Sequence, residues 1–177
     1  MLYKIRSLCP TSVSRSLYYS LFNSHLSYGL SVWGSAGLAD IAKIQSLQDN
    51  AIKSIYKINE PHNLAKKYFD LEILNINDQI EHQLSSLMWD YDHNTLPSSL
   101  KRIFIRIDTI HNYRTRGALR GNLYHKKVNT VQFGVKSFTY QGIHILNNLK
   151  GSNIYNSSKT KFQFLRQLKI YLKSQYV

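Results

Sequence analysis

Residues 38–58 read LADIAKIQSLQDNAIKSIYKI and carry the most regular pattern in the chain. Apolar side chains recur in this segment at intervals of three and four residues: Leu38, Ile41, Ile44, Leu47, Ala51, Ile52, Ile55 and Ile58. Such intervals place side chains on one face of a helix. The segment therefore predicts an amphipathic helix. We expect Asn59-Glu60-Pro61 to end it, because proline cannot continue the helical hydrogen bonds.

The preceding segment, residues 12–33, also predicts a helix. Thr11, Ser12 and Ser14 are all competent N-cap residues, and the turn-forming stretch 34–37 follows its end. Its leucine and aromatic side chains lie on more than one side of a helix, which is typical of a helix buried in a core.

The rest of the chain predicts further helices and one irregular region. We expect a short helix over 62–69, a helix capped by Asn77 or Asp78 with Ile80, Leu84, Leu87, Met88 and Tyr91 on one face, and short helices over 97–106 and 137–149. Residues 108–128 have no period and predict a loop or extended arm, and residues 130–135 are compatible with a short strand. The chain closes on a basic amphipathic helix over 159–176, with Phe162, Leu165, Leu168, Leu172 and Tyr176 in register. The expected fold is mostly α: a helical bundle over 1–108, then a basic region over 109–177.

Charge is distributed very unevenly along the chain. The formal net charge is +13, yet residues 1–108 hold 11 basic and 10 acidic side chains. No acidic residue follows Asp108, whereas 12 lysines and arginines do. Such a surface binds polyanions by releasing their condensed counterions. Large aromatic residues are interspersed among these charges, unlike in a disordered tail. A nucleic acid is the expected partner.

Residue patterns for catalysis or cofactor binding are missing from the sequence. Cys9 is the single cysteine, the seven histidines show no metal-ligand spacing, and no glycine-rich phosphate loop is present. Asp90 and Asp92 are two positions apart, so on a helix they point in different directions. We therefore expect no catalytic residue, metal or cofactor. No segment approaches the ~20 apolar residues of a membrane span, and Lys4 and Arg6 interrupt the N-terminal apolar run, so an intracellular protein without a membrane partner is expected.

Several sequence blocks carry a resemblance to a known family. Residues 17–34, LYYSLFNSHLSYGLSVWG, are followed by a helical pattern at Lys43, Ile44, Leu47, Gln48, Ala51, Ile52, Lys53 and Ile55. Looser blocks are Leu96-Pro97, His111-Asn112-Tyr113 with Thr115-Arg116, and Lys136-Ser137-Phe138 with Tyr140, Gly142 and Asn147. Together they resemble the region after the polymerase domain of LINE-type, jockey-like non-LTR retrotransposon reverse transcriptases, over about residues 2 to 172. Arg114, Leu146 and Lys150 depart from that pattern, where the family has a small polar residue, a tryptophan and a proline.

The resemblance implies a helical thumb and post-thumb region that holds a primer–template. The family's catalytic aspartates lie on an upstream palm hairpin, so no polymerase activity is expected of these residues alone, and the polymerase part of the parent element is an expected partner. Thumb contacts fix phosphates and sugars without reading sequence. The basic residues expected to grip RNA, DNA or their hybrid are Arg114, Arg116, Arg120, Lys126, Lys127, Lys159, Lys161, Arg166 and Lys169. Tyr113 and Tyr124 are candidates for stacking on unpaired bases.

Two other interpretations stay open. The basic amphipathic helix at the C-terminus also suits a helical interaction module that binds an acidic protein or a membrane surface. The arm over 109–128 favours an extended polyanion instead, because it is basic without an amphipathic period. A non-functional relic of a mobile element is the third reading, and it predicts exposed apolar surface.

Overall fold

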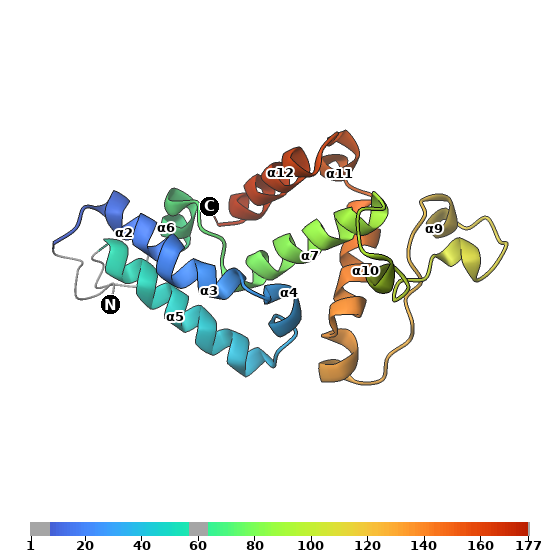
Figure 1. Ribbon diagram of the computed structural model, residues 1–177, viewed down its shortest axis with the longest axis horizontal. Coiled ribbons are helices and arrows are strands. Elements are labelled where there is room, and N and C mark those ends of the chain that lie inside the picture. Colours follow the sequence, from blue (N-terminus) through green and yellow to red (C-terminus); the bar gives the residue numbers. More distant parts are fainter. Residues whose placement is uncertain (1–7, 57–63, 177) are drawn as a thin grey trace. The chain divides into compact units, whose positions relative to one another are not determined.

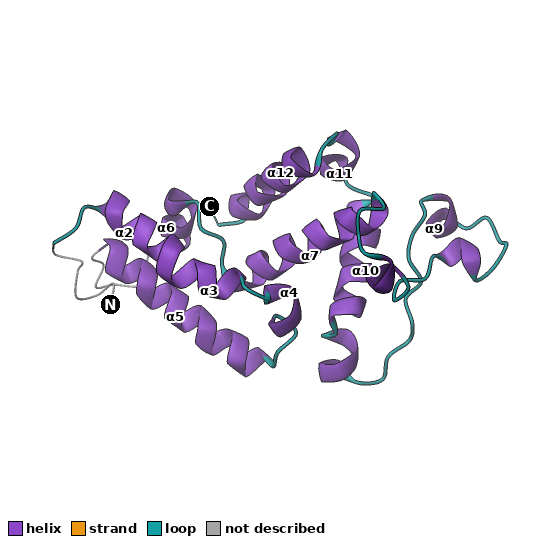
Figure 2. Cartoon of the chain, viewed as in Figure 1, coloured by secondary structure: helices purple, strands orange, loops and turns teal. Residues whose placement is uncertain are grey.

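The computed structural model describes residues 8–56 and 64–176, and their regular structure is helical (Figure 2). Within these residues, β-type pairing is limited to one isolated antiparallel bridge between Arg106 and Leu123. The prediction of a mostly α fold is confirmed. The short strand expected over 130–135 is wrong, because η3 (Val131–Val135) is a single wide helical turn closed by the Lys136 N–H and the Val131 carbonyl at 2.9 Å. A short apolar run has no periodicity that separates a strand from a helical turn.

By contacts, the chain divides into two compact units. Unit 1 runs to Ile80 and includes the C-terminal residues from Lys169, whereas unit 2 runs from Glu81 to Leu168. The charge balance changes at residue 108, and the sequence predicts a domain boundary there. The change in charge and the change in packing fall at different positions, because surface composition does not determine which helices share a core.

The first part of unit 1 is a broken helix. α2 (Thr11–Leu17) continues into the π-helical turn η1 (Tyr18–Asn23) and α3 (Ser24–Ser27), and α4 (Leu30–Trp33) follows a break (Figure 1). The single helix expected over 12–33 is therefore interrupted. Gly29 lies at the break with φ +64°, a left-handed conformation that glycine adopts without the steric cost of a Cβ atom.

The core of unit 1 lies between α5 (Leu38–Tyr56), η1 and α6 (Leu64–Leu71). Its buried side chains are Tyr18, Ala51, Ile52, Ile55, Tyr68, Leu71 and Ile73. Gln48 is fully buried and donates to the Tyr18 hydroxyl at 2.9 Å and to the Leu74 carbonyl at 2.8 Å. Burial raises the pKa of Tyr18 to about 12, so this hydroxyl stays neutral at physiological pH.

The helix predicted over 38–58 is confirmed as far as Tyr56, but two residues of its predicted apolar face lie outside the core. Leu38 is 73% exposed and Leu47 is 58% exposed. The predicted end at Asn59-Glu60-Pro61, with Ile58 and the start of the next expected helix, lies outside the described residues.

α7 (Ile76–Asp92) begins at a reciprocal cap. The Asn75 side chain accepts from the Asp78 N–H at 2.9 Å and donates to the Asp78 carboxylate at 2.8 Å. Asn75 therefore caps this helix, and the predicted caps Asn77 and Asp78 both lie within its first turn. The predicted buried face is largely correct: Ile80, Leu84 and Met88 are in the core.

Unit 2 is built around the second half of α7 and α10 (Phe138–Leu149), which confirms the helix predicted over 137–149. Shorter elements connect them: α8 (Ser98–Lys101), η2 (Ile107–Thr109) and α9 (Arg116–Leu119). α8 is shorter than the helix expected over 97–106. Leu146, one of the departures from the resemblance described above, is fully buried.

α11 (Asn153–Ser157) was not predicted, whereas α12 (Lys161–Ser174) lies within the helix predicted over 159–176. Within unit 2, the fully buried Phe164 stacks on Trp89 with 4.7 Å between ring centroids and meets Tyr155 edge-on at 5.5 Å. Phe162, which the sequence predicts in register with Leu165, Leu168, Leu172 and Tyr176 on one face of this helix, is 75% exposed. That expectation is wrong because this helix has apolar residues on two faces, and the packing uses the one that contains Phe164.

Candidate nucleic-acid interface

The predicted arm is an ordered loop, and residues just before it pair with residues 122–124 within it. We call residues 108–128 the basic loop. Two hydrogen bonds join residues before the loop to residues within it: the Tyr124 N–H donates to the Ile105 carbonyl at 2.7 Å, and the Ile107 N–H donates to the Asn122 carbonyl at 3.1 Å. These bonds flank the bridge between Arg106 and Leu123, and Leu123 is only 1% exposed. The pairing closes the base of the loop.

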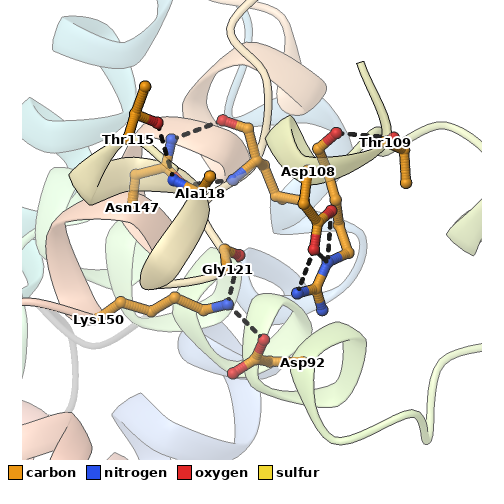
Figure 3. Close-up of polar contacts among 10 residues, drawn as sticks. Asp92, Asp108, Thr109, Thr115, Ala118, Gly121, Asn147 and Lys150 are labelled. Atoms are coloured by element: carbon orange, nitrogen blue, oxygen red, sulfur yellow. Dashed lines mark hydrogen bonds and ion pairs between the residues drawn. The ribbon is translucent and has the colours of Figure 1, made fainter. Parts of the chain in front are cut away.

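Two side chains from the end of α10 fix this base in place (Figure 3). The Asn147 amide accepts from the Leu123 N–H at 2.8 Å and donates to the Leu123 carbonyl at 2.9 Å. The Lys150 ammonium donates to the Gly121 carbonyl at 2.7 Å and lies 2.7 Å from an Asp92 carboxylate oxygen. The Lys150 side chain is only 10% exposed, so this ion pair is well shielded from water.

Within the loop, the single helical turn α9 is capped at both ends. The Thr115 hydroxyl accepts from the Ala118 N–H at 3.2 Å at its start. At its end, the Gly121 N–H donates to the Ala118 carbonyl at 3.0 Å and the Asn122 N–H donates to the Gly117 carbonyl at 2.9 Å, with Gly121 at φ +66°. This bonding pattern is a Schellman cap, which favours glycine at its left-handed position. The loop is therefore locally ordered, although its sequence has no period.

The structure places the first group of predicted binding residues on this loop. All five basic residues are exposed: Arg114, Arg116, Arg120, Lys126 and Lys127. None of the ion pairs within residues 8–56 and 64–176 includes any of them. Tyr113 is 77% exposed and Tyr124 is 42% exposed, so both tyrosine rings are accessible to solvent.

The structure does not bring the remaining predicted basic residues together; these are Lys159, Lys161, Arg166 and Lys169. Lys159 and Arg166 are exposed, but Lys161 lies 2.5 Å from an Asp90 carboxylate oxygen. Lys169 belongs to unit 1, whereas the other three belong to unit 2. Among these four, Lys159 and Arg166 therefore have the free charges that could add to those of the basic loop.

Acidic residues of unit 2 neutralise anchoring side chains and leave the loop charges free. Unit 2 contains 13 basic and four acidic residues. Asp90, Asp92 and Asp108 pair with Lys161, Lys150 and Arg106. The hydrogen bond from the Arg106 guanidinium lowers the pKa of Asp108. These pairings leave the positive charge concentrated on the loop, where it acts on an approaching anion.

Asp90 and Asp92 have structural contacts in this fold. Besides their lysine partners, the Asp90 carboxylate accepts from the Thr95 hydroxyl at 3.1 Å and the Asp92 carboxylate accepts from the Tyr155 hydroxyl at 2.6 Å. A search of the described residues found no group of three or more His, Cys, Asp or Glu side chains placed to hold a metal ion.

We predict that Asn147→Ala loosens the base of the basic loop. Leu123 is buried, so the substitution leaves its N–H and carbonyl without partners, at a cost of about 1–3 kcal/mol for each such group. The expected result is at least tenfold faster hydrogen exchange at the Leu123 amide and faster tryptic cleavage after the loop arginines. Asn148→Ala is the matched control, because Asn148 is exposed and bonds only to His144 on the same helix. Equal protection of the Leu123 amide from hydrogen exchange in the two variants would contradict the anchoring role of Asn147.

The Asp92 contacts also predict a pH dependence of unit 2. Burial raises the pKa of Asp92, but hydrogen bonds from Lys150 and Tyr155 and the Lys150 charge outweigh it, so the net shift is downward from 3.8. A lowered pKa stabilises the fold at pH values above 3.8, and this contribution is lost as the pH falls through the folded-state value. In urea unfolding, we expect Asp92→Asn to lower the free energy of unfolding at pH 7. The difference in this free energy from the native chain should shrink as the pH falls below 3.8. A difference that stays constant down to pH 2 would contradict this assignment.

Sequence reasoning missed the anchoring residues Asn147, Lys150 and Asp92. In the sequence, Asn147 belongs to one of the looser blocks that carry the resemblance, and Lys150 is one of the departures from it. The usable signal was the scarcity of acids: unit 2 has four acidic and 13 basic residues, so basic partners are available to every acid. The pair Thr115 and Gly121, six residues apart, also marks a one-turn helix with caps at both ends.

Comparison with known proteins gave no match: no protein-family model matches the chain, and neither the curated proteins nor the solved structures include one that matches it significantly. No helix in the described part of the chain is both long and apolar enough to cross a membrane.

Proposed function

We propose that this chain is the thumb and post-thumb part of a LINE-type reverse transcriptase and that it holds an RNA–DNA primer–template through the basic loop. The observation that carries the proposal is the set of five exposed, unpaired basic residues on an ordered, anchored loop. The sequence blocks described above support the proposed family, and the charge distribution supports the proposal that the ligand is a polyanion.

The loop is suited to phosphates rather than to base edges. Its arginines present several N–H donors in a fixed geometry that fits phosphate oxygens. Arg116 and Arg120 are four residues apart across one helical turn, so their side chains start from the same side of α9. Contacts of this kind set the position of a duplex without reading its sequence. In the proposed polymerase the palm supplies the metal-dependent chemistry, and this chain supplies grip.

A fluorescence-anisotropy titration with an RNA–DNA hybrid at 50 and 200 mM salt tests the proposal. If about six phosphates are contacted, the affinity should fall on the order of a thousandfold between these concentrations. Two hybrids of unrelated sequence should bind within a few-fold of each other. A flat salt response or strong sequence preference would contradict the proposed grip. We expect no metal-dependent primer extension by the pure chain, and observing it would refute the assignment to a region outside the palm.

One observation favours a second function, contact with another protein. Tyr28 is 85% exposed and Val32 is 71% exposed, and both lie in or beside α4 of unit 1. We propose that this apolar surface contacts the polymerase part of the parent element. Pull-down of a recombinant palm fragment by the chain should be lost in Tyr28→Ser/Val32→Ser. Retention of an equal amount by both chains would exclude this surface.

A further inference from the structure

In unit 1, apart from the basic loop, two basic side chains pair with one carboxylate, and a third, Lys169, lies within electrostatic range of all three. The Arg15 guanidinium lies 3.4 Å from one Glu72 oxygen and the Lys173 ammonium lies 3.9 Å from the other. Lys169 precedes Lys173 by four residues on α12, so the two side chains share a face of that helix. Arg15 comes from α2, Glu72 follows α6, and the lysines come from α12, so segments distant in sequence form the cluster.

The backbone at Glu72 fixes the point from which its side chain starts. Glu72 has φ +57°, a left-handed conformation that favours glycine or asparagine at the end of a helix. The Glu72 N–H donates to the Phe69 carbonyl at 3.0 Å and the Ile73 N–H donates to the Tyr68 carbonyl at 3.1 Å, which forms a Schellman cap on α6. The cap fixes the point from which the carboxylate reaches Arg15 and Lys173.

Aromatic rings hold two of the cations. The Lys173 ammonium lies 5.3 Å from the centroid of the Phe69 ring, and the Arg15 guanidinium lies 5.9 Å from that of Tyr19. The Tyr19 hydroxyl in turn donates to the Glu72 carbonyl oxygen at 3.2 Å. Because the Lys173 side chain is only 13% exposed, much of its rotational freedom is already lost before any ligand binds.

The cluster keeps an excess of positive charge. Two cations pair with one carboxylate and the charge of Lys169 is a third, and like charges held near one another repel. Burial lowers the pKa of Lys169; Glu72 opposes this shift, whereas the charges of Lys173 and Arg15 add to it. A bound anion would relieve the repulsion and return the pKa of Lys169 towards its usual range.

We propose that Arg15, Lys169 and Lys173 form a phosphate-binding site in unit 1, separate from the basic loop. Its ligand is a phosphate group, either in a nucleic-acid backbone or in a free polyphosphate. Phosphate chemistry fits because it offers several oxygens to one guanidinium and two ammonium groups. The site stands on unit 1 alone and does not depend on the function proposed for the loop.

The first test titrates the full chain with inorganic pyrophosphate at constant ionic strength and follows backbone amides by NMR. We expect saturable shifts at residues around Glu72, Lys169 and Lys173, with an at least tenfold weaker affinity in Lys169→Gln and in Arg15→Gln. Lys43→Gln on α5 is the control with the same change in net charge, since Lys43 pairs only with Asp40 and its side chain is 76% exposed. Shifts that do not saturate, or an equal affinity in Lys169→Gln and Lys43→Gln, would overturn the site.

The second test identifies the source of the phosphate. Hybrid binding is measured in a chain that lacks the loop charges Arg114, Arg116 and Arg120, with and without Lys169→Gln. If Lys169→Gln weakens hybrid binding by at least a further fivefold, the site binds nucleic-acid backbone. If the two chains bind the hybrid equally, and the chain that keeps Lys169 still binds pyrophosphate, the site binds a free polyphosphate. If the native chain binds no hybrid, the proposed function fails, but the pyrophosphate result still decides the unit 1 site.

Discussion

Replacing Arg114, Arg116 and Arg120 together by glutamine is expected to weaken binding of an RNA–DNA hybrid by on the order of a hundredfold to a thousandfold at 50 mM salt. A charge-assisted hydrogen bond contributes about 1.5 kcal/mol or more, which corresponds to roughly tenfold for each phosphate contact. The three side chains are exposed and belong to none of the ion pairs in the described residues, so their removal leaves no buried charge without a partner.

Salt dependence separates a lost contact from a general loss of charge. Each phosphate contact removed should reduce the slope of log affinity against log salt by about 0.9, so the triple variant should lose between about 2 and 3. The matched control is Lys43→Gln/Lys53→Gln/Lys66→Gln, which removes three charges from unit 1. If both triple variants weaken binding equally, net charge rather than the basic loop governs the interaction.

Phe164→Ala is expected to destabilise the protein by about 3–5 kcal/mol, the usual cost of removing a buried phenyl ring. Phe164 is fully buried against Trp89 and Tyr155, which come from two other elements of unit 2, so the substitution leaves a cavity bounded by two aromatic rings. Urea unfolding followed by tryptophan fluorescence measures this loss, because Trp89 lies directly against the cavity.

Phe162→Ala is the control for this prediction. Phe162 lies two residues away on the same helix and is 75% exposed, so its removal should change stability by less than about 0.5 kcal/mol. Phe162 is one of the five residues that the sequence pattern places in register on the apolar face of this helix. If Phe162→Ala lowers the free energy of unfolding more than Phe164→Ala does, Phe162 rather than Phe164 is the packed residue, which contradicts the packing described above.

The helices themselves were predictable from sequence, but for a helix that is apolar on two sides the sequence does not specify which side is buried. α5 and α10 were expected within a few residues of their bounds, because local periodicity specifies α5 and Ser137 caps the start of α10. α12 was also expected, but its sequence is apolar on two sides. The choice between Phe162 and Phe164 depends on Trp89, more than 70 positions earlier in the chain, and no local pattern contains that information.

The candidate site was predictable in composition but not in arrangement. The absence of acids after Asp108 indicated where positive charge gathers. It did not show that Lys161 pairs with Asp90, because that contact joins positions 71 apart. The order of the basic loop was equally invisible, since it depends on Asn147 and Lys150, two side chains of a helix that follows the loop.

A side-chain amide carries the same donor and acceptor as a peptide group, so Asn147 acts towards Leu123 as a neighbouring strand one residue long. The two closest relatives of asparagine should both fail in this role: aspartate lacks the donor, and glutamine is one methylene longer. Because the attachment is made at Leu123 and Gly121, the part of the loop before Gly121 can change in length and charge while its base stays fixed. Two nearby positions, Asn147 and Lys150, thus hold a segment whose remaining residues are free to diversify.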